Sequence, residues 1–134
     1  MATTQLELVT PEALLMSEAV GMVVVPGVEG DMGIMADHAP TVSTLRPGVV
    51  TVHEEANGAA SRQIFVGGGV AEVTGERCII LAEEAIELAD LERAHVDARM
   101  TEALAAVAAA TSDGEKAQAE AELAIAEAQV AALG

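Results

Sequence analysis

The strongest constraint on the fold is a change of composition near Glu84. All four prolines and ten of the twelve glycines precede it, whereas seventeen of the 46 residues from Ala89 to the last position are alanine. Glycine and proline disfavour helices and alanine is the best helix former, so the two parts cannot share one type of secondary structure. The sequence therefore predicts an all-β N-terminal domain over residues 1–86 and a helical C-terminal part over residues 87–134.

Short apolar segments rich in β-branched residues, separated by turn residues, run through the N-terminal part. Two hairpins are predicted, one turning at Asn57-Gly58 and the other at Thr74-Gly75-Glu76. Many short strands with regular turn signals are typical of an antiparallel sandwich or a barrel. The strands expected from this pattern are residues 5–9, 21–27, 49–55, 61–67, 70–73 and 77–82.

Three consecutive glycines, Gly67 to Gly69, raise the question of a phosphate-binding loop. They match neither G-x-G-x-x-G nor the Walker pattern, and no helix is predicted after them. Glycines between two strand segments usually mark a bulge or a close approach of the backbone. We interpret the three glycines in this structural sense.

Two helices are predicted in the C-terminal part. The first has Asp90 as its N-cap and runs to about Ala110. Residues 111–114 interrupt the helical pattern, and Ser112 with Glu115 three residues later forms a capping box for the second helix. A short break between two such helices implies an antiparallel hairpin. The apolar stripes are Val96, Met100, Ala103 and Val107, with Leu104 beside them, in the first helix and Ala119, Leu123, Ala126, Val130 and Leu133 in the second.

The alanine content has a consequence for the hairpin. A buried leucine or valine contributes about 1.5–3 kcal/mol and a buried alanine much less. We therefore expect the two helices to be individually helix-prone but weakly docked on the β domain. Arg93 and Arg99, two of only six basic residues, are expected to form weak exposed ion pairs with acidic residues of their own helix, namely Glu92, Asp97 or Glu102.

The charge of the chain excludes several classes of partner. There are 22 acidic and 6 basic residues, a formal net charge of −16, which repels nucleic acid and anionic lipid. Phe65 is the only aromatic residue, so the stacking platform of single-strand binders is also missing. The N-terminal residues lack the pattern of a signal peptide, and no apolar run reaches the ~18–20 residues that span a bilayer. Cys78, the only cysteine, is expected to be a buried inert thiol in a strand.

One short segment concentrates groups that could carry chemistry. Glu29, Asp31, Asp37 and His38 lie within ten residues and could form a metal site, an acid/base pair, or a solvated loop that another protein binds. No EF-hand loop, H-x-x-x-H, C-x-x-C or G-x-S-x-G pattern occurs. A solvated acidic loop is therefore favoured, and neither a metal site nor a catalytic site is predicted.

The order of these features resembles a known family. A glycine-bent acidic loop followed by His-Ala-Pro, a V-x-G-G segment and a helical hairpin opening with D-x-x-R-A is similar to the epsilon subunit of F-type ATP synthase, which is called delta in mitochondria. The resemblance covers essentially the whole chain. The matching segments are Gly27–Ile34, His38–Pro40, Arg46–Gly48, Phe65–Gly69, Ala71–Val73 and Asp90–Ala94.

The resemblance implies a fold and a role. It implies a β-sandwich of two antiparallel sheets followed by an antiparallel helical hairpin, in a non-catalytic subunit of the central rotor stalk that couples proton flow to ATP synthesis. It also implies a position on the cytoplasmic face of the bacterial plasma membrane, without insertion into the bilayer. The expected contacts with the ring of c subunits are Glu29, Gly30 and Asp31. The expected contacts with the gamma subunit are His38, Ala39 and Pro40.

The hairpin of bacterial relatives can reach the catalytic head of alpha and beta subunits, and in some it binds ATP through the motif Ile/Leu-Asp-x-x-Arg-Ala. Here the motif is Ala89–Ala94, in which Asp90 and Arg93 match and the first position departs. The hairpin offers few other basic residues to hold phosphates. We therefore predict weak or absent ATP binding, weak inhibition of hydrolysis, and no other cofactor. The alternatives are a soluble β-sandwich adaptor unrelated to a rotary motor and a small metal-dependent enzyme that uses the acidic loop.

Overall fold

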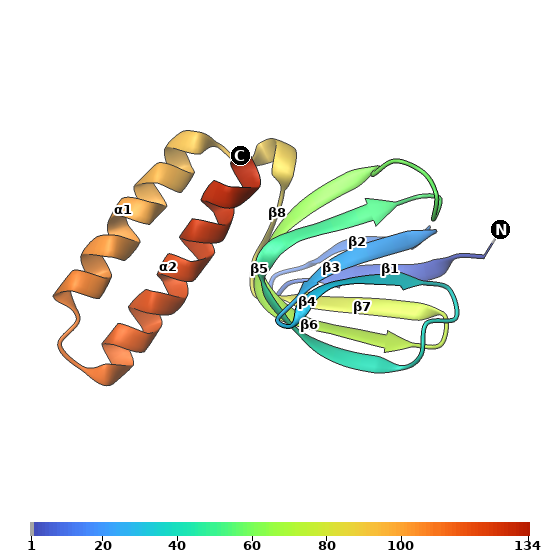
Figure 1. Cartoon of the computed structure of the whole chain (residues 1–134), viewed down its shortest axis with the longest axis horizontal. Coiled ribbons are helices and arrows are strands. Elements are labelled where there is room, and N and C mark those ends of the chain that lie inside the picture. Colours follow the sequence, from blue (N-terminus) through green and yellow to red (C-terminus); the bar gives the residue numbers. More distant parts are fainter. Residues whose placement is uncertain (1) are drawn as a thin grey trace.

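A computed structural model describes residues 2–134, with a β-sandwich and, beside it, a pair of helices (Figure 1). The predicted sandwich followed by a helical hairpin is confirmed. The strands are β1 (Thr4–Val9), β2 (Leu14–Val20), β3 (Met22–Gly27), β4 (Gly30–Met35), β5 (Thr41–His53), β6 (Arg62–Thr74), β7 (Arg77–Ala82) and β8 (Ala85–Glu87). A 3-10 helix, η1 (Leu88–Asp90), leads to α1 (Arg93–Ala109) and α2 (Asp113–Leu133).

Two long strands, β5 and β6, turn the sheet into a sandwich. The strand order is β2-β1-β7-β6-β5-β3-β4, and β8 pairs with β6. The last six residues of β6 pair with β7, whereas Ile64–Val66 pair with β8. Between these halves Leu45 pairs with Gly69 and Pro47 with Gly67, so the pairing skips one position without a change of register. Both strands bend there, at the end that faces the helices (Figure 1).

One pair in the sandwich differs from the antiparallel arrangement expected of the sheets. Strands β1 and β7 are parallel, with Leu6 opposite Cys78 and Leu8 opposite Ile80. The pairing is possible because the two strands are far apart in the sequence, so no tight turn has to join them. The remaining strand pairs are antiparallel.

The sandwich core is aliphatic, as the composition requires. Residues alternate along β1, where Leu6 and Leu8 face inward, and the same alternation runs along β7, where Cys78 and Ile80 are buried. Burial raises the pKa of the Cys78 thiol to about 11. The prediction of a buried thiol is confirmed, and at neutral pH it is protonated and unreactive.

Gly67 and Gly69 of β6 have steric roles and Gly68 has φ +100°, which confirms the structural interpretation. A Cβ on Gly69 would lie 2.1 Å from the carbonyl oxygen of Leu81, and its φ is +147°. A Cβ on Gly67 would lie 2.4 Å from Cγ of Glu84. These glycines let the segment between β7 and β8 pass directly against β6, and the amide of Gly67 donates to the carbonyl of Glu84 at 3.0 Å.

The first helix begins later than predicted. Its N-cap is Glu92, which makes no side-chain capping bond, and Asp90 instead ends the 3-10 helix. Leu91 is extended, with φ −78° and ψ 118°, so the helical conformation cannot run through from Asp90. The predicted N-cap at Asp90 is therefore wrong.

The predicted cap at Ser112 is confirmed, whereas the reciprocal bond of Glu115 goes to Thr111, one residue before the cap. The Ser112 hydroxyl accepts a hydrogen bond from the amide of Glu115 at 3.2 Å. The Glu115 carboxylate in turn accepts from the hydroxyl of Thr111 at 2.7 Å and from its amide at 3.3 Å. These bonds lower the pKa of Glu115, that from the Thr111 hydroxyl contributing most.

Replacing this cap gives a first testable expectation. In a Ser112→Ala variant the free energy of unfolding should fall by about 1 kcal/mol, because an orphan amide of the first turn of α2 loses its acceptor. Urea unfolding followed by circular dichroism measures the change. A Thr101→Ala variant is the control, since the Thr101 hydroxyl donates only to a carbonyl inside α1. An equal loss in both variants would contradict a specific role for the cap.

The hairpin covers the outer side of the layer that contains β8, β6 and β5. Helix α2 lies between α1 and the sandwich (Figure 1) and contacts β5 and β6. Ile64 and Val66 face the sandwich core, so Phe65 between them points outward, yet its exposure is 0%. The only aromatic ring of the chain is therefore buried under the helices rather than inside the sandwich. Within residues 2–134, no helix is both long and apolar enough to cross a bilayer.

Candidate functional site: an apolar sheet face and two loops

The opposite layer of the sandwich carries an uncovered apolar surface on its outer side. Cross-strand pairs place Val42 beside Glu72, Glu72 beside Ile79, and Val70 beside Leu81. The parallel pair then continues the second row from Leu81 to Val9, and Val9 pairs with Leu14. The residues of this outer apolar face are Val9, Leu14, Val42, Val70, Ile79 and Leu81.

The outer apolar face is open to solvent. Val42 is 73% exposed, Leu14 57% and Leu81 48%. Apolar side chains scattered singly are normal on a protein surface, but here Val70, Leu81, Val9 and Leu14 form a row across four strands, with Val42 diagonal to Val70 on the fifth. A contiguous apolar patch of this kind is typical of an interaction surface. Two carboxylates, Glu7 and Glu72, lie within the same face, because Glu7 pairs with Ile79 and Glu72 with both Val42 and Ile79. The face can thus bind an apolar partner surface that also carries basic groups.

Sequence reasoning missed this face, although a signal for it exists. In β7, Cys78, Ile80 and Ala82 are buried, and the alternate positions Ile79 and Leu81 are apolar as well. A strand with one solvated face normally alternates apolar and polar residues. A strand of an antiparallel hairpin that is apolar on both faces therefore indicates that a partner covers its second face.

The loop predicted to contact gamma joins this face. Residues 36–40 connect β4 to β5, and the face begins two residues later at Val42. The loop has a fixed shape: the amide of His38 donates to the carbonyl of Met35 at 3.2 Å, and His38 Nδ1 lies 2.8 Å from the carbonyl oxygen of Ala39. Asp37 has φ +66°, a left-handed conformation that Asp tolerates better than most residues. Asp37 therefore has a structural role in this loop.

The acidic turn predicted to contact the c ring lies at the other end of β4. Gly30 and Asp31 are the first residues of this strand rather than part of a loop, and Gly30 has φ +134°. Asp31 is paired with Arg46, whose guanidinium donates to Oδ1 at 2.6 Å and to the carbonyl of Gly27 at 2.6 Å. Among the described residues no ion pair is found for Glu29, so Glu29 carries the uncompensated charge of this turn.

The two residues of the ATP-type motif have different surroundings. Asp90 lines a cavity of about 350 Å³ with Arg62 and Glu87. Arg93 instead donates to the carbonyl oxygen of Gly134, at the end of α2, at 3.3 Å. The guanidinium of Arg93 thus neutralises the negative end of a helix dipole.

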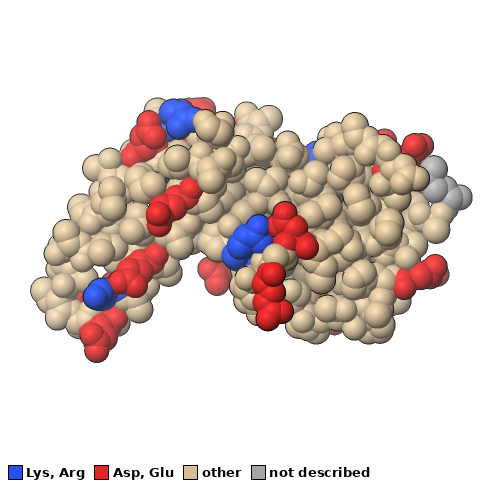
Figure 2. Space-filling view, in the orientation of Figure 1, with Lys and Arg blue, Asp and Glu red and all other residues tan. Residues whose placement is uncertain are grey.

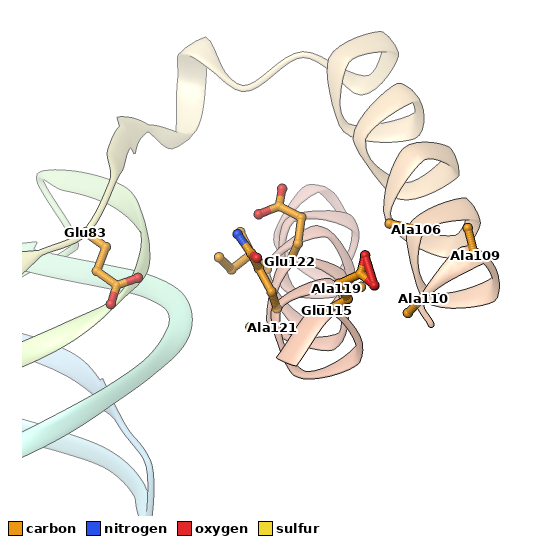
Figure 3. A pocket seen from close by; sticks show the side chains of 10 residues that line it. Glu83, Ala106, Ala109, Ala110, Glu115, Ala119, Ala121 and Glu122 are labelled. Carbon is orange, nitrogen blue, oxygen red and sulfur yellow. The ribbon is translucent and has the colours of Figure 1, made fainter. Parts of the chain in front are cut away.

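A cavity at the helical hairpin offers no basic group to a phosphate. It has a volume of about 590 Å³ and lies between the far ends of the two helices and the segment after β7 (Figure 3). Its walls are alanine methyl groups and three carboxylates, Glu83, Glu115 and Glu122, together with Gln118 and Ile125. A polyanion would meet repulsion there. In residues 2–134 no three His, Cys, Asp or Glu side chains are grouped so as to hold a metal ion.

Arg99 does not pair within its own helix, so that expectation is wrong. Its guanidinium donates to both oxygens of Glu84, at 2.8 and 2.6 Å, and to Glu122 at 2.5 Å. The two carboxylates come from the segment before β8 and from α2, and Arg99 comes from α1. This Arg99 cluster (Glu84, Arg99 and Glu122) joins both helices to the sandwich. The bonds to Glu84, followed by that to Glu122, raise the pKa of Arg99.

The surface as a whole is acidic but not uniformly so. In the view of Figure 2, acidic groups are scattered over the helices and the sandwich, most basic groups touch acidic ones, and wide areas carry no charge. Such a surface suits binding to a protein partner better than to a polyanion.

The chain is a β-sandwich with a docked helical hairpin, and comparison with known proteins identifies its family. The family described as ATP synthase, Delta/Epsilon chain, beta-sandwich domain, matches residues 3–88. The chain belongs to this family. Its curated relatives include the ATP synthase epsilon chain of Rhodospirillum rubrum, 53% identical over 97% of this chain and 96% of the relative. The epsilon chain of Paramagnetospirillum magneticum is 48% identical over 96% of both chains.

Solved structures agree with this assignment. A chain in the Euglena gracilis mitochondrial ATP synthase, solved as OSCP, F1 and c ring, is similar with a TM-score of 0.82 and 28% identity, over 100% of this chain and 83% of that one. A chain in the central stalk and c ring of the Tetrahymena thermophila mitochondrial ATP synthase has a TM-score of 0.70 at 13% identity, over 98% and 96% of the two chains. The second similarity concerns the fold alone.

Proposed function

We propose that this chain is a non-catalytic subunit of the central rotor stalk of a proton-translocating F-type ATP synthase, coupling the c ring and gamma to ATP synthesis. The main observation in support of this role is the outer apolar face, which continues into the loop of His38, Ala39 and Pro40. The similar chain of Euglena occurs in a structure that contains F1 and a c ring. In this role the chain sits on the cytoplasmic face of the bacterial plasma membrane as a peripheral part of the complex.

The outer apolar face and the His38 loop form the contact with gamma. Val42, at the junction of the two, is the most exposed of the large apolar residues. Covering this face removes apolar area from water, which is the main favourable term in association. Glu7 is already paired with Arg77, so the carboxylate of Glu72 is the one that orients the partner through complementary charge.

The turn of Glu29, Gly30 and Asp31 forms the contact with the c ring. Because Arg46 already neutralises Asp31, Glu29 supplies the charge that attracts basic groups of the ring. Val28 beside it is 56% exposed, and its amide donates to the carbonyl of Thr44 at 3.0 Å. The turn is thus fixed to β5, the same strand that carries Val42, so a force on one contact reaches the other through a rigid strand.

Regulation of hydrolysis by the hairpin is weak in this proposal. The head of alpha and beta subunits is a conditional partner, reached only when the helices leave the sandwich. ATP does not stabilise the docked hairpin, because Arg93 is bonded to the end of α2 and the cavity at the opposite end of the hairpin is lined by carboxylates instead of basic groups.

Reconstitution tests the proposal. Purified gamma, a c ring and the catalytic head are assembled in proteoliposomes with or without this chain, and ATP synthesis driven by a proton gradient is measured. Synthesis should depend on the chain, and Glu29→Lys should weaken its association by about 10-fold or more because like charges then meet. Glu55→Lys, in the exposed loop after β5, is the matched control. Equal synthesis without the chain would overturn the proposed role.

A further inference from the structure

Apolar contacts between the hairpin and the sandwich involve mainly small side chains. Beside the buried ring of Phe65, a cavity of about 430 Å³ separates α2 from residues 46–51 of β5, and its helix side is lined only by Ala128, Ala131 and Ala132. Alanine methyl groups bury little area and contribute little to docking. A polar contact that spans the junction therefore has a large share in deciding whether the hairpin stays docked.

The Arg99 cluster is such a contact. We propose that Arg99 acts as a conformational latch, a single guanidinium that holds α1 against α2 and both helices against the sandwich, so that its release frees the hairpin as a unit. The bond to Glu84 is bidentate, which is the strong geometry of an arginine–carboxylate pair. The third bond, from Nε to Glu122, uses one of the three N–H donors that the bidentate pair leaves free.

Removal of Arg99 would leave like charges facing each other. The Arg99 side chain is 24% exposed, and the cluster holds one positive and two negative charges. Without Arg99, two carboxylates face each other across the junction with no cation between them, and they repel. Loss of the arginine therefore changes attraction into repulsion instead of merely removing a bond.

Backbone hydrogen bonds to β6 fix the position of Glu84 on the sandwich. The carbonyl of Glu84 accepts from the amide of Gly67, and the amide of Glu83 donates to the carbonyl of Gly68 at 3.2 Å. Because a Cβ at Gly67 would overlap Cγ of Glu84, the absence of a side chain at this position is what allows the carboxylate to reach Arg99. The latch acts in the isolated chain and is independent of the proposed rotor role.

Hydrogen exchange of the intact chain tests the latch. In Arg99→Gln, the amides of α1 and α2 should exchange about 10- to 100-fold faster than in the unmodified chain, as expected for the loss of hydrogen bonds to charged groups. The amides of β1 and β7 should exchange at unchanged rates. Gly67→Ala, which displaces Glu84 and leaves Arg99 in place, should accelerate the same helical amides.

The controls separate a latch from a general loss of stability. Arg93→Gln removes a basic residue of the same helix and should leave the exchange of the central helical amides unchanged. Arg99→Lys, which keeps the positive charge but not the bidentate guanidinium, should accelerate exchange of the helical amides to an intermediate degree. Unchanged helical exchange in Arg99→Gln, or equal acceleration in helices and strands, would overturn the proposal. Should Arg99→Gln fail to fold, Glu84→Gln and Glu122→Gln provide the same comparison from the carboxylate side.

Discussion

Val42→Asp is expected to reduce the affinity of the chain for purified gamma by about 100-fold or more. In the free chain the Val42 side chain is 73% exposed, so an aspartate there is solvated and the fold is undisturbed. In the complex the same carboxylate would be removed from water without a group of opposite charge to pair with it. Burying an uncompensated charge at the centre of an interface costs several kcal/mol, and about 1.4 kcal/mol corresponds to each factor of ten in affinity. Isothermal titration calorimetry measures the change.

A matched variant distinguishes the proposed interface from a general effect of adding charge. Leu104, on α1, is 53% exposed and lies outside the outer apolar face, so Leu104→Asp should bind gamma like the unmodified chain. Leu81→Asp, on the neighbouring row of the face, should lose affinity as Val42→Asp does. Retained affinity in both face variants would show that gamma does not bind this surface.

The division into a sandwich and a hairpin could be predicted because its causes are local. Proline and glycine exclude helix and alanine favours it wherever they occur, so the boundary near Glu84 is visible in composition alone. The cap at Ser112 depends on residues three apart. By contrast, β4 was taken for a loop because its glycines and acidic residues, among them Gly30 and Asp31, are typical of turns. Pairing with β3 along six positions overrides that local preference.

The contact surfaces depend on register, which the sequence does not display. Val42 and Leu81 belong to one face only because β5, β6 and β7 pair in the register observed. The Arg99 cluster shows the same limit: its partners are 15 and 23 residues away in the sequence, whereas sequence reasoning assigned Arg99 to neighbours on its own helix. The c-ring contact of the turn at Glu29 is a prediction from resemblance, and only the geometry shows that Arg46 neutralises Asp31 and not Glu29.

Phe65→Ala is expected to lower the free energy of unfolding by about 3–5 kcal/mol, the usual cost of truncating a buried phenylalanine. The loss should fall on the hairpin before the sandwich, because the ring lies on the outer side of β6 under the helices, whereas Ile64 and Val66 fill the sandwich core. Urea unfolding followed by helical circular dichroism, together with hydrogen exchange of the strands, measures both effects. The helical signal should disappear at a lower urea concentration than the protection of β1 and β7.

Ile64→Ala is the informative comparison, since it truncates the neighbouring residue on the inner side of the same strand. It should cost about 2–5 kcal/mol but should lower the protection of strands and helices together, because the sandwich is the platform on which the hairpin rests. If Phe65→Ala also weakened both parts equally, the ring would belong to the sandwich core. A separate loss of the helices means instead that one aromatic ring and one arginine together hold an otherwise alanine-lined hairpin, so that docking can change without unfolding the sandwich.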